Sequence, residues 1–237
     1  MTLRIETSTD RWARMIRSTG LVGLITIAVL FAPIIAISSL GEPPFVASAE
    51  AARTFFVNGS AGWAQVAEAL TSLSAIGLIW FVSGLSLLLA RGEGSPPWRS
   101  AVALVSGVML SAYLLLDVSW DAASFGSTDL DLSVASYAFD SGNIAFANVW
   151  LAMASFAVAC GWLILSTRVV GRWLGWWSIA SGLGLGISRF FWTSAIWFLP
   201  YAAFWIWMII ICVQLIWRPG TVLNGADGHA RQGDELP

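Results

Sequence analysis

Long apolar segments alternate with short polar ones along most of this chain. A helix that crosses a bilayer needs about 20 consecutive, mostly apolar residues, and about six segments reach that length. We therefore predict an all-α protein, a polytopic membrane helix bundle with six transmembrane helices. The predicted spans are residues 19–40, 63–90, 100–120, 143–166, 174–191 and 197–217.

The polar segments divide the chain into three regions. Residues 1–18 form a basic N-terminal segment, residues 19–217 the six-helix transmembrane domain, and residues 218–237 a polar tail that we predict to be disordered. Within the transmembrane domain, the two longest links, residues 41–60 and 121–140, are predicted loops.

The arginines fix a predicted orientation, because short cytoplasmic segments of membrane proteins are enriched in arginine and lysine. If both termini are cytoplasmic, all but two of the 12 basic residues lie inside, and Arg53 and Arg189 remain outside. The opposite orientation would reverse this excess, so we predict cytoplasmic N- and C-termini and a plasma-membrane protein. The predicted inner arginines are Arg4, Arg11, Arg14, Arg17, Arg91, Arg99, Arg168, Arg172, Arg218 and Arg231.

Composition supports a lipid environment and excludes several kinds of chemistry. Mean hydropathy is +0.76 and 11% of residues are charged, whereas soluble domains carry about 25% charged residues. The chain has no lysine, which excludes a lysine Schiff base, and its one histidine, His229, lies in the polar tail. Cys160 and Cys212 lie inside predicted spans, where thiols behave as small apolar groups. We expect no cofactor and no metal site.

Four ionisable residues lie within or beside the predicted spans: Glu68, Asp117, Asp121 and Arg189. An ionised side chain at the centre of a membrane helix costs about 2.5–3.5 kcal/mol, so such residues usually face the bundle interior and find partners. At 1.5 Å of rise per residue, Arg189 lies about 22 Å from the inner boundary, and the carboxylates lie at a similar level. We therefore predict one polar cluster in the outer half of the bundle, completed by Gln65, Asn143 and Asn148.

Three interpretations of this predicted cluster remain open. It can be a buried ion pair that fixes helix packing, since removing one partner of such a pair costs about 3–5 kcal/mol. It can be a ligand or ion site that opens to the outer face. Catalysis is the third interpretation, but the chain lacks a nucleophile and base motif such as G-x-S-x-G or H-E-x-x-H. The sequence therefore names no catalytic residue and favours a non-enzymatic protein.

Tryptophans and glycines suggest how the helices sit and pack. Many of the 15 tryptophans fall near predicted membrane boundaries, as expected of interfacial belts. A tryptophan-lined cleft around Trp192, Trp197, Trp205 and Trp207 is the alternative. Gly182 and Gly186 have the G-x-x-x-G spacing that lets helix backbones approach closely.

Two stretches resemble a family of uncharacterised bacterial six-helix membrane proteins, a domain of unknown function. They are Arg14-Met-Ile-Arg-Ser-Thr-Gly-Leu-Val-Gly-Leu and the pair Gly161-Trp-Leu-Ile-Leu-Ser and Arg172-Trp-Leu-Gly-Trp-Trp-Ser-Ile-Ala-Ser-Gly182. The resemblance covers about residues 12–217. It implies a bacterial integral membrane protein, and it brings no catalytic residues with it.

Two function classes follow from these observations. The first is a membrane protein that binds or passes a small solute, ion or lipid through the predicted polar cluster. The second is a membrane-embedded accessory subunit, or a membrane enzyme, that packs against a partner protein. The expected partners are the lipid bilayer, a small solute or lipid, and a membrane protein or a second copy of the chain; no nucleic acid is expected.

Overall fold

The structure, a computed structural model, describes residues 8–39, 41–59, 63–116 and 130–224. These residues form helices and short links, without strands, so the predicted all-α class is confirmed for the described part of the chain. The long helices are α1 (Ser8–Ser38), α3 (Trp63–Glu93), α4 (Trp98–Leu116), α6 (Leu132–Thr167), α7 (Arg172–Ser188) and α8 (Phe198–Trp217). The shorter ones are α2 (Ala49–Gly59) and two 3-10 turns, η2 (Arg189–Phe191) and η3 (Ala195–Trp197).

Five segments of the described chain are long and apolar enough to cross a membrane. They lie in α1, α3, α4 and α6, and in η3 together with α8. The sixth predicted span, residues 174–191, corresponds to α7, which has 17 residues and continues directly into η2. Its length is therefore close to the lower limit for a membrane helix.

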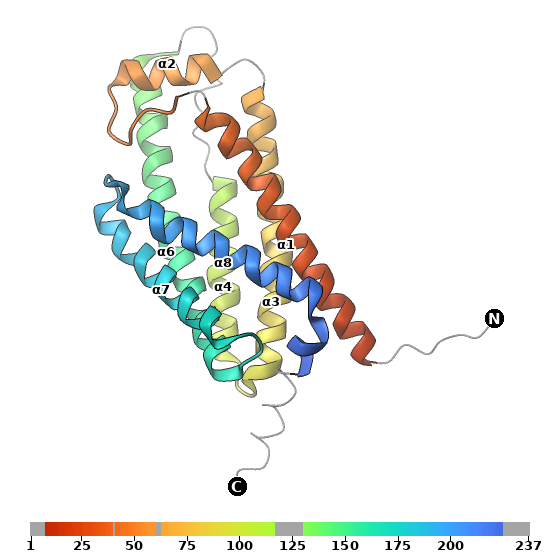
Figure 1. The fold of residues 1–237 in the computed structure, drawn as a ribbon. Coiled ribbons are helices and arrows are strands. Elements are labelled where there is room, and N and C mark those ends of the chain that lie inside the picture. The colour runs from red at the N-terminus through yellow and green to blue at the C-terminus, as the bar shows by residue number, and fades with distance from the viewer. Residues whose placement is uncertain (1–7, 40, 60–62, 117–129, 225–237) are drawn as a thin grey trace, which may run out of the picture.

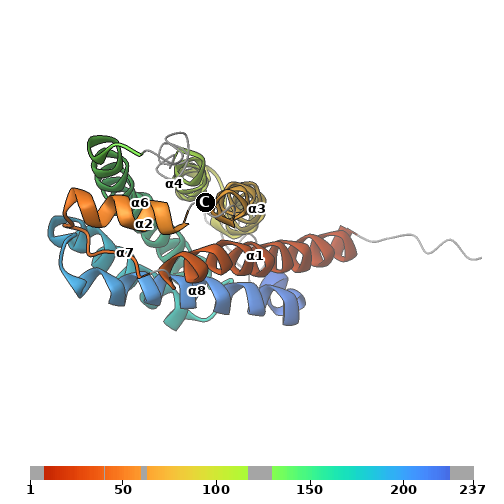
Figure 2. The same ribbon diagram turned by 90° about the horizontal axis from the view of Figure 1, so that it is seen from above.

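The six long helices form a closed ring in chain order. Each of α1, α3, α4, α6 and α7 packs against the next, and α8 packs back against α1. Successive helices run in opposite directions, so α1 begins and α8 ends at the same end of the bundle (Figure 1). Seen along the bundle, α1 and α8 lie together on one side of α3 and α4 (Figure 2).

Arginines mark the two ends of the bundle. We call the end where α1 begins and α8 ends the arginine-rich end, and the opposite end, which carries Arg53 and Arg189, the arginine-poor end. The described arginines at the arginine-rich end are Arg11, Arg14, Arg17, Arg91, Arg99, Arg168, Arg172 and Arg218.

Two of the links differ from the prediction. Residues 49–59 of the predicted loop 41–60 form helix α2, because Ala52, Phe55 and Phe56 bury one face against α6. Helix α6 begins at Leu132, inside the predicted loop 121–140, where Asp131 caps it by accepting a hydrogen bond from the Ser133 amide at 2.7 Å. Together α2 and the first turns of α6 form a small second hydrophobic core at the arginine-poor end.

The start of the C-terminal tail also differs from the prediction. Residues 219–224 form a helical turn, and Val222 and Leu223 are buried against the main core. The remainder of the predicted disordered tail lies outside the described residues.

Small residues allow the closest helix contacts. A Cβ added at Gly161 of α6 would lie 2.6 Å from the Gly175 carbonyl oxygen of α7, and one at Gly182 would lie 2.9 Å from the Ala154 carbonyl. In α3, Gly77 and Gly84 lie against Thr26 and Thr19 of α1. The Ser178 hydroxyl of α7 also donates to the Ala157 carbonyl of α6 at 2.7 Å. The backbones of α6 and α7 are therefore in near contact.

We predict that Gly161→Ala destabilises the bundle by about 1–3 kcal/mol, since the new methyl group meets backbone rather than a flexible side chain. Thermal unfolding in detergent would measure the effect. The control is Gly186→Ala, whose Cβ would lie 3.9 Å from the Ala154 Cβ, an ordinary contact. Equal unfolding temperatures for the two variants would show that the α6 and α7 backbones are not in near contact.

Candidate functional site

Arg189, at the end of α7, contacts α6. Its guanidinium Nε donates a hydrogen bond to the Asn148 Oδ1 at 2.9 Å. Arg189 is half-buried and Asn148 is exposed. Helix α7 ends at Ser188 and the chain tightens into η2, which turns the Arg189 side chain back toward α6. Two residues of the predicted polar cluster, Arg189 and Asn148, are thus in direct contact.

Asn143 forms a hydrogen bond to a different part of the chain. Its amide Nδ2 donates to the Phe45 carbonyl at 3.5 Å, so it joins α6 to the link that precedes α2. Asn143 and Asn148 are five residues apart, which separates them by about 140° around the helix axis. The structure therefore places the two asparagines on different faces of α6.

The other members of the predicted cluster lie outside what the structure describes. The backbone of Gln65 and Glu68 belongs to the first turns of α3, but their side chains are outside the described part. Asp117 and Asp121 fall in the segment 117–129, which is also outside it. The predicted contact between Arg189 and a carboxylate stays a prediction.

A groove with several polar side chains in its lining lies beside the Arg189 and Asn148 pair, between α4 and α6. It has a volume of about 530 Å³. We call it the α4–α6 groove, and its lining residues are Tyr113, Tyr137, Asp140, Ser141, Ile144, Ala145 and Asn148. Asp140 supplies a carboxylate, the tyrosines supply phenol groups, and Asn148 links the groove to Arg189.

Sequence reasoning identified Asn148 but missed the other polar residues of this groove. Tyr137, Asp140, Ser141, Ile144 and Asn148 recur at intervals of three or four, the spacing of one helical face. This signal depends on recognising residues 132–142 as helix, whereas residues 121–140 are predicted to form a loop.

Aromatic rings fill the bundle interior at the arginine-poor end. Trp150 of α6 stacks on Trp197, with ring centroids 5.4 Å apart and an interplanar angle of 24°. Phe146 packs edge-on against Trp150, Trp197 and Tyr201. Phe45 covers Phe146 and Trp197 from the link before α2. We call these five residues, Phe45, Phe146, Trp150, Trp197 and Tyr201, the aromatic cluster.

The tryptophans of the alternative cleft pack against other rings. Trp192 contacts Phe45, and Trp197 belongs to the aromatic cluster. Trp205 packs against Phe31 of α1 at 5.2 Å. Trp207 lies against Phe156 and Phe204 further along the bundle and is fully buried. Trp205 and Trp207 therefore lie in a packed interior, whereas Trp192 and Trp197 are half-buried at its edge.

Asp131 adds a fixed negative charge at the arginine-poor end. Hydrogen bonds from the Ser133 hydroxyl and amide lower its pKa, with a smaller contribution from the positive charge of Arg53 on α2. The carboxylate that caps α6 therefore remains ionised at neutral pH.

At the arginine-rich end, one carboxylate holds the turn between α3 and α4. The Glu93 Oε1 accepts from the Arg99 amide at 3.0 Å and from the Arg99 Nε at 2.8 Å. Its Oε2 accepts from the Ser100 amide at 2.9 Å and from the Ser100 hydroxyl at 2.6 Å. Both carboxylate oxygens of this buried side chain are thereby satisfied.

The described residues contain no group of three or more histidine, cysteine or acidic side chains that could hold a metal ion. Cys160 and Cys212 are buried free thiols in α6 and α8. Comparison with protein-family models, with curated proteins and with solved structures found no match.

We predict that Arg189 and Asn148 are energetically coupled. Arg189→Leu, Asn148→Leu and the double variant should give a coupling free energy of about 0.5–1.5 kcal/mol, the range for a partly exposed hydrogen bond from a charged group. Thermal unfolding of the purified variants measures it. The control cycle pairs Asn148→Leu with Arg172→Leu at the other end of the bundle, where the two effects should add. A coupling energy no larger than that of the control would contradict the contact.

Proposed function

We propose that this chain is a multi-pass protein of a bacterial plasma membrane that binds a small ammonium-bearing solute in the α4–α6 groove, on the outer side. In this proposal α7 crosses the membrane as the sixth span, and both termini are cytoplasmic. The observation that carries the proposal is the lining of the groove, in which Asp140 is accompanied by two tyrosines and by Asn148.

The distribution of arginines supports this orientation. Eight described arginines lie at the end where α1 begins and α8 ends, and Arg53 and Arg189 lie at the other. Cytoplasmic segments carry such an excess. The length of α7 is compatible with a sixth span, because α7 and η2 together run without interruption from Arg172 to Phe191.

The depth of the groove supports a ligand from the outer aqueous side. Along α6, Asn148 lies about 29 Å from Thr167 at the arginine-rich end, and the hydrocarbon core of a bilayer is about 30 Å thick. Asn148 would then lie at the outer edge of the hydrocarbon. Tyr137, Asp140 and Ser141 would lie beyond it, at the level of the headgroups and the adjoining water.

The chemistry of the lining favours an ammonium group. Asp140 is the charged side chain among the lining residues, and its carboxylate attracts a cation. The faces of Tyr113 and Tyr137 can add cation–π attraction, worth about 0.5–1 kcal/mol at exposed sites. The Ser141 hydroxyl and the Asn148 amide can bind a polar group elsewhere on the same ligand.

The aromatic cluster favours binding at this lateral groove over passage through the centre of the ring. Trp150 is fully buried and is stacked on Trp197, and Phe146 and Tyr201 pack around them. Close-packed interiors leave few voids larger than a water molecule. A solute held between α4 and α6 does not have to displace these rings.

The orientation is tested with single cysteines at the two ends. Val46→Cys, in the exposed link before α2, should react with a membrane-impermeant maleimide on intact cells. Gly220→Cys, where an added Cβ meets open space, should react only after the cells are opened. Cys160 and Cys212 are buried, so the native background should be low. If the Gly220→Cys variant were labelled on intact cells, the orientation would be the opposite of the one proposed.

The ligand class is tested with choline as the probe and sodium acetate as the anionic comparison. Choline at a hundred times its dissociation constant should add about 2.7 kcal/mol to the free energy of unfolding by mass action. It should therefore raise the unfolding temperature of the purified protein, and acetate should not. Asp140→Asn should abolish the choline effect. The matched control, Glu50→Gln, removes an exposed carboxylate from α2, outside the groove, and should keep the effect.

Two results would contradict the proposal. One is a choline effect that is equal in the Asp140→Asn variant and in the unsubstituted protein. The other is the absence of any choline effect together with stabilisation by acetate.

A further inference from the structure

A second groove lies at the opposite end of the molecule, along the last turns of α8. It has a volume of about 360 Å³ and is lined by Ile209, Ile210, Val213, Gln214, Trp217 and Arg218. We call it the α8 groove. It is separate from the α4–α6 groove in sequence and lies at the arginine-rich end of the bundle (Figure 1).

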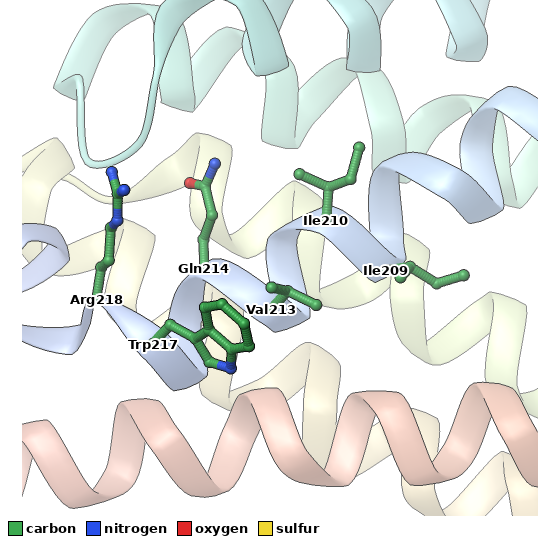
Figure 3. Close-up of a pocket in the computed structure, with 6 residues that line it drawn as sticks. All are labelled: Ile209, Ile210, Val213, Gln214, Trp217 and Arg218. Atoms are coloured by element: carbon green, nitrogen blue, oxygen red, sulfur yellow. The ribbon is translucent and has the colours of Figure 1, made fainter.

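The α8 groove is polar at one end and apolar along the rest. Gln214 and Arg218 are one turn apart, and their polar ends point the same way, whereas Ile209, Ile210 and Val213 continue the groove along the helix (Figure 3). The lining therefore changes from cationic to apolar along the axis of α8. A ligand that matches this change has a charged head and an apolar chain.

The length of the α8 groove fits one leaflet of a bilayer. From Arg218 to Ile209 the helix rises about 14 Å, which is close to half of the hydrocarbon thickness of about 30 Å. Arg218 follows the last residue of α8, beside the exposed ring of Trp217, and in a bilayer this end of the helix would lie at the membrane boundary. A chain that enters at Arg218 and ends near Ile209 would stay within a single leaflet.

The polar groups at the mouth of this groove have unused hydrogen-bonding capacity. Among the described residues, neither the Arg218 guanidinium nor the Gln214 side-chain amide has a hydrogen-bond partner. The two residues are joined through their backbones, where the Arg218 N–H donates to the Gln214 carbonyl at 2.9 Å. Guanidinium groups donate paired hydrogen bonds to phosphate oxygens. An anionic phosphate at the mouth would satisfy both side chains.

The charge at this end of the molecule selects an anionic lipid over a neutral one. Eight described arginines lie there. The Glu93 carboxylate at the same end is held by Arg99 and Ser100, so its charge is neutralised locally. Each arginine near a charged membrane surface is worth about 1 kcal/mol of attraction to anionic lipid.

We propose that the α8 groove binds one anionic phospholipid of the leaflet at the arginine-rich end, with its phosphate on Arg218 and Gln214 and an acyl chain along Val213, Ile210 and Ile209. This site does not depend on the solute site proposed above, because it uses another helix end and another ligand.

The test compares phosphatidylglycerol with phosphatidylcholine as probes. The protein is placed in mixed micelles of each lipid, and native mass spectrometry counts the lipid molecules that remain bound. We expect one phosphatidylglycerol to be retained in preference to phosphatidylcholine. Arg218→Gln should reduce this retention more than about tenfold, because it removes charge-assisted hydrogen bonds to the phosphate in addition to one positive charge. The matched control, Arg11→Gln, removes one exposed arginine from the same end without touching the groove and should lose no more than the about fivefold expected of a general charge effect.

A second variant tests the acyl-chain half of the site. Val213→Trp fills the groove while leaving Arg218 in place, and it should lower the retention of phosphatidylglycerol without changing the elution of the protein as a single species. Soluble glycerol 3-phosphate, added as a competitor, should not displace the lipid, because it lacks the chain.

Three outcomes would overturn the proposal. They are equal retention of the two lipids, equal losses in the Arg218→Gln and Arg11→Gln variants, and full displacement by glycerol 3-phosphate. The second would indicate a general charge effect, and the third a free phosphate site.

Discussion

The near contact between the backbones of α6 and α7 determines how the rest of the bundle is arranged. In lipid, helices gain little from burying apolar surface against one another, so association depends on close packing and on hydrogen bonds between helices. Gly161 and Gly175 provide the packing, and Ser178 provides a bond to the Ala157 carbonyl. This contact fixes the direction of α7, which in turn carries Arg189 to Asn148 and returns α8 to α1.

Helix α6 is one continuous helix that reaches from the ring of long helices to α2 at the arginine-poor end. It has 36 residues, about 54 Å of helix, whereas a bilayer core is about 30 Å thick. Its second half packs within the ring, and its first turns extend past the ring and carry α2. The α4–α6 groove lies where these two parts join, so its polar residues are held by a helix that is anchored on both sides.

The sequence predicted the helices that are uniformly apolar and missed those that are not. The predicted spans 63–90 and 197–217 agree closely with α3 and α8, because both contain a long run of mostly apolar residues. Helix α2 is amphipathic and short, so it has no long apolar run to detect. The first turns of α6 mix Ser133, Ser136 and Asp140 with apolar residues, and their average polarity resembles that of a loop.

The predicted site shows the same limit. Counting residues along a helix gave the level of Arg189, and Asn148 was among the residues expected at that level. Counting could not give the direction of each side chain around its helix, which is why Asn143 and Asn148 were grouped although they face different neighbours. The partners of a side chain depend on how its helix is rotated about its own axis. That rotation is set by contacts such as the one between Gly161 and Gly175, which lies far from the site.

The turn between α3 and α4 bears on the order in which parts of the chain can fold during synthesis. The Glu93 carboxylate accepts four hydrogen bonds from Arg99 and Ser100, which follow it by six and seven residues. Its charge can therefore be neutralised as soon as that turn emerges from the ribosome, before α6 has been made. The turn between α3 and α4 can thus close before α6 exists, and the bond from Arg99 to Ser166, at 3.1 Å, then attaches α6 to a turn that is already closed.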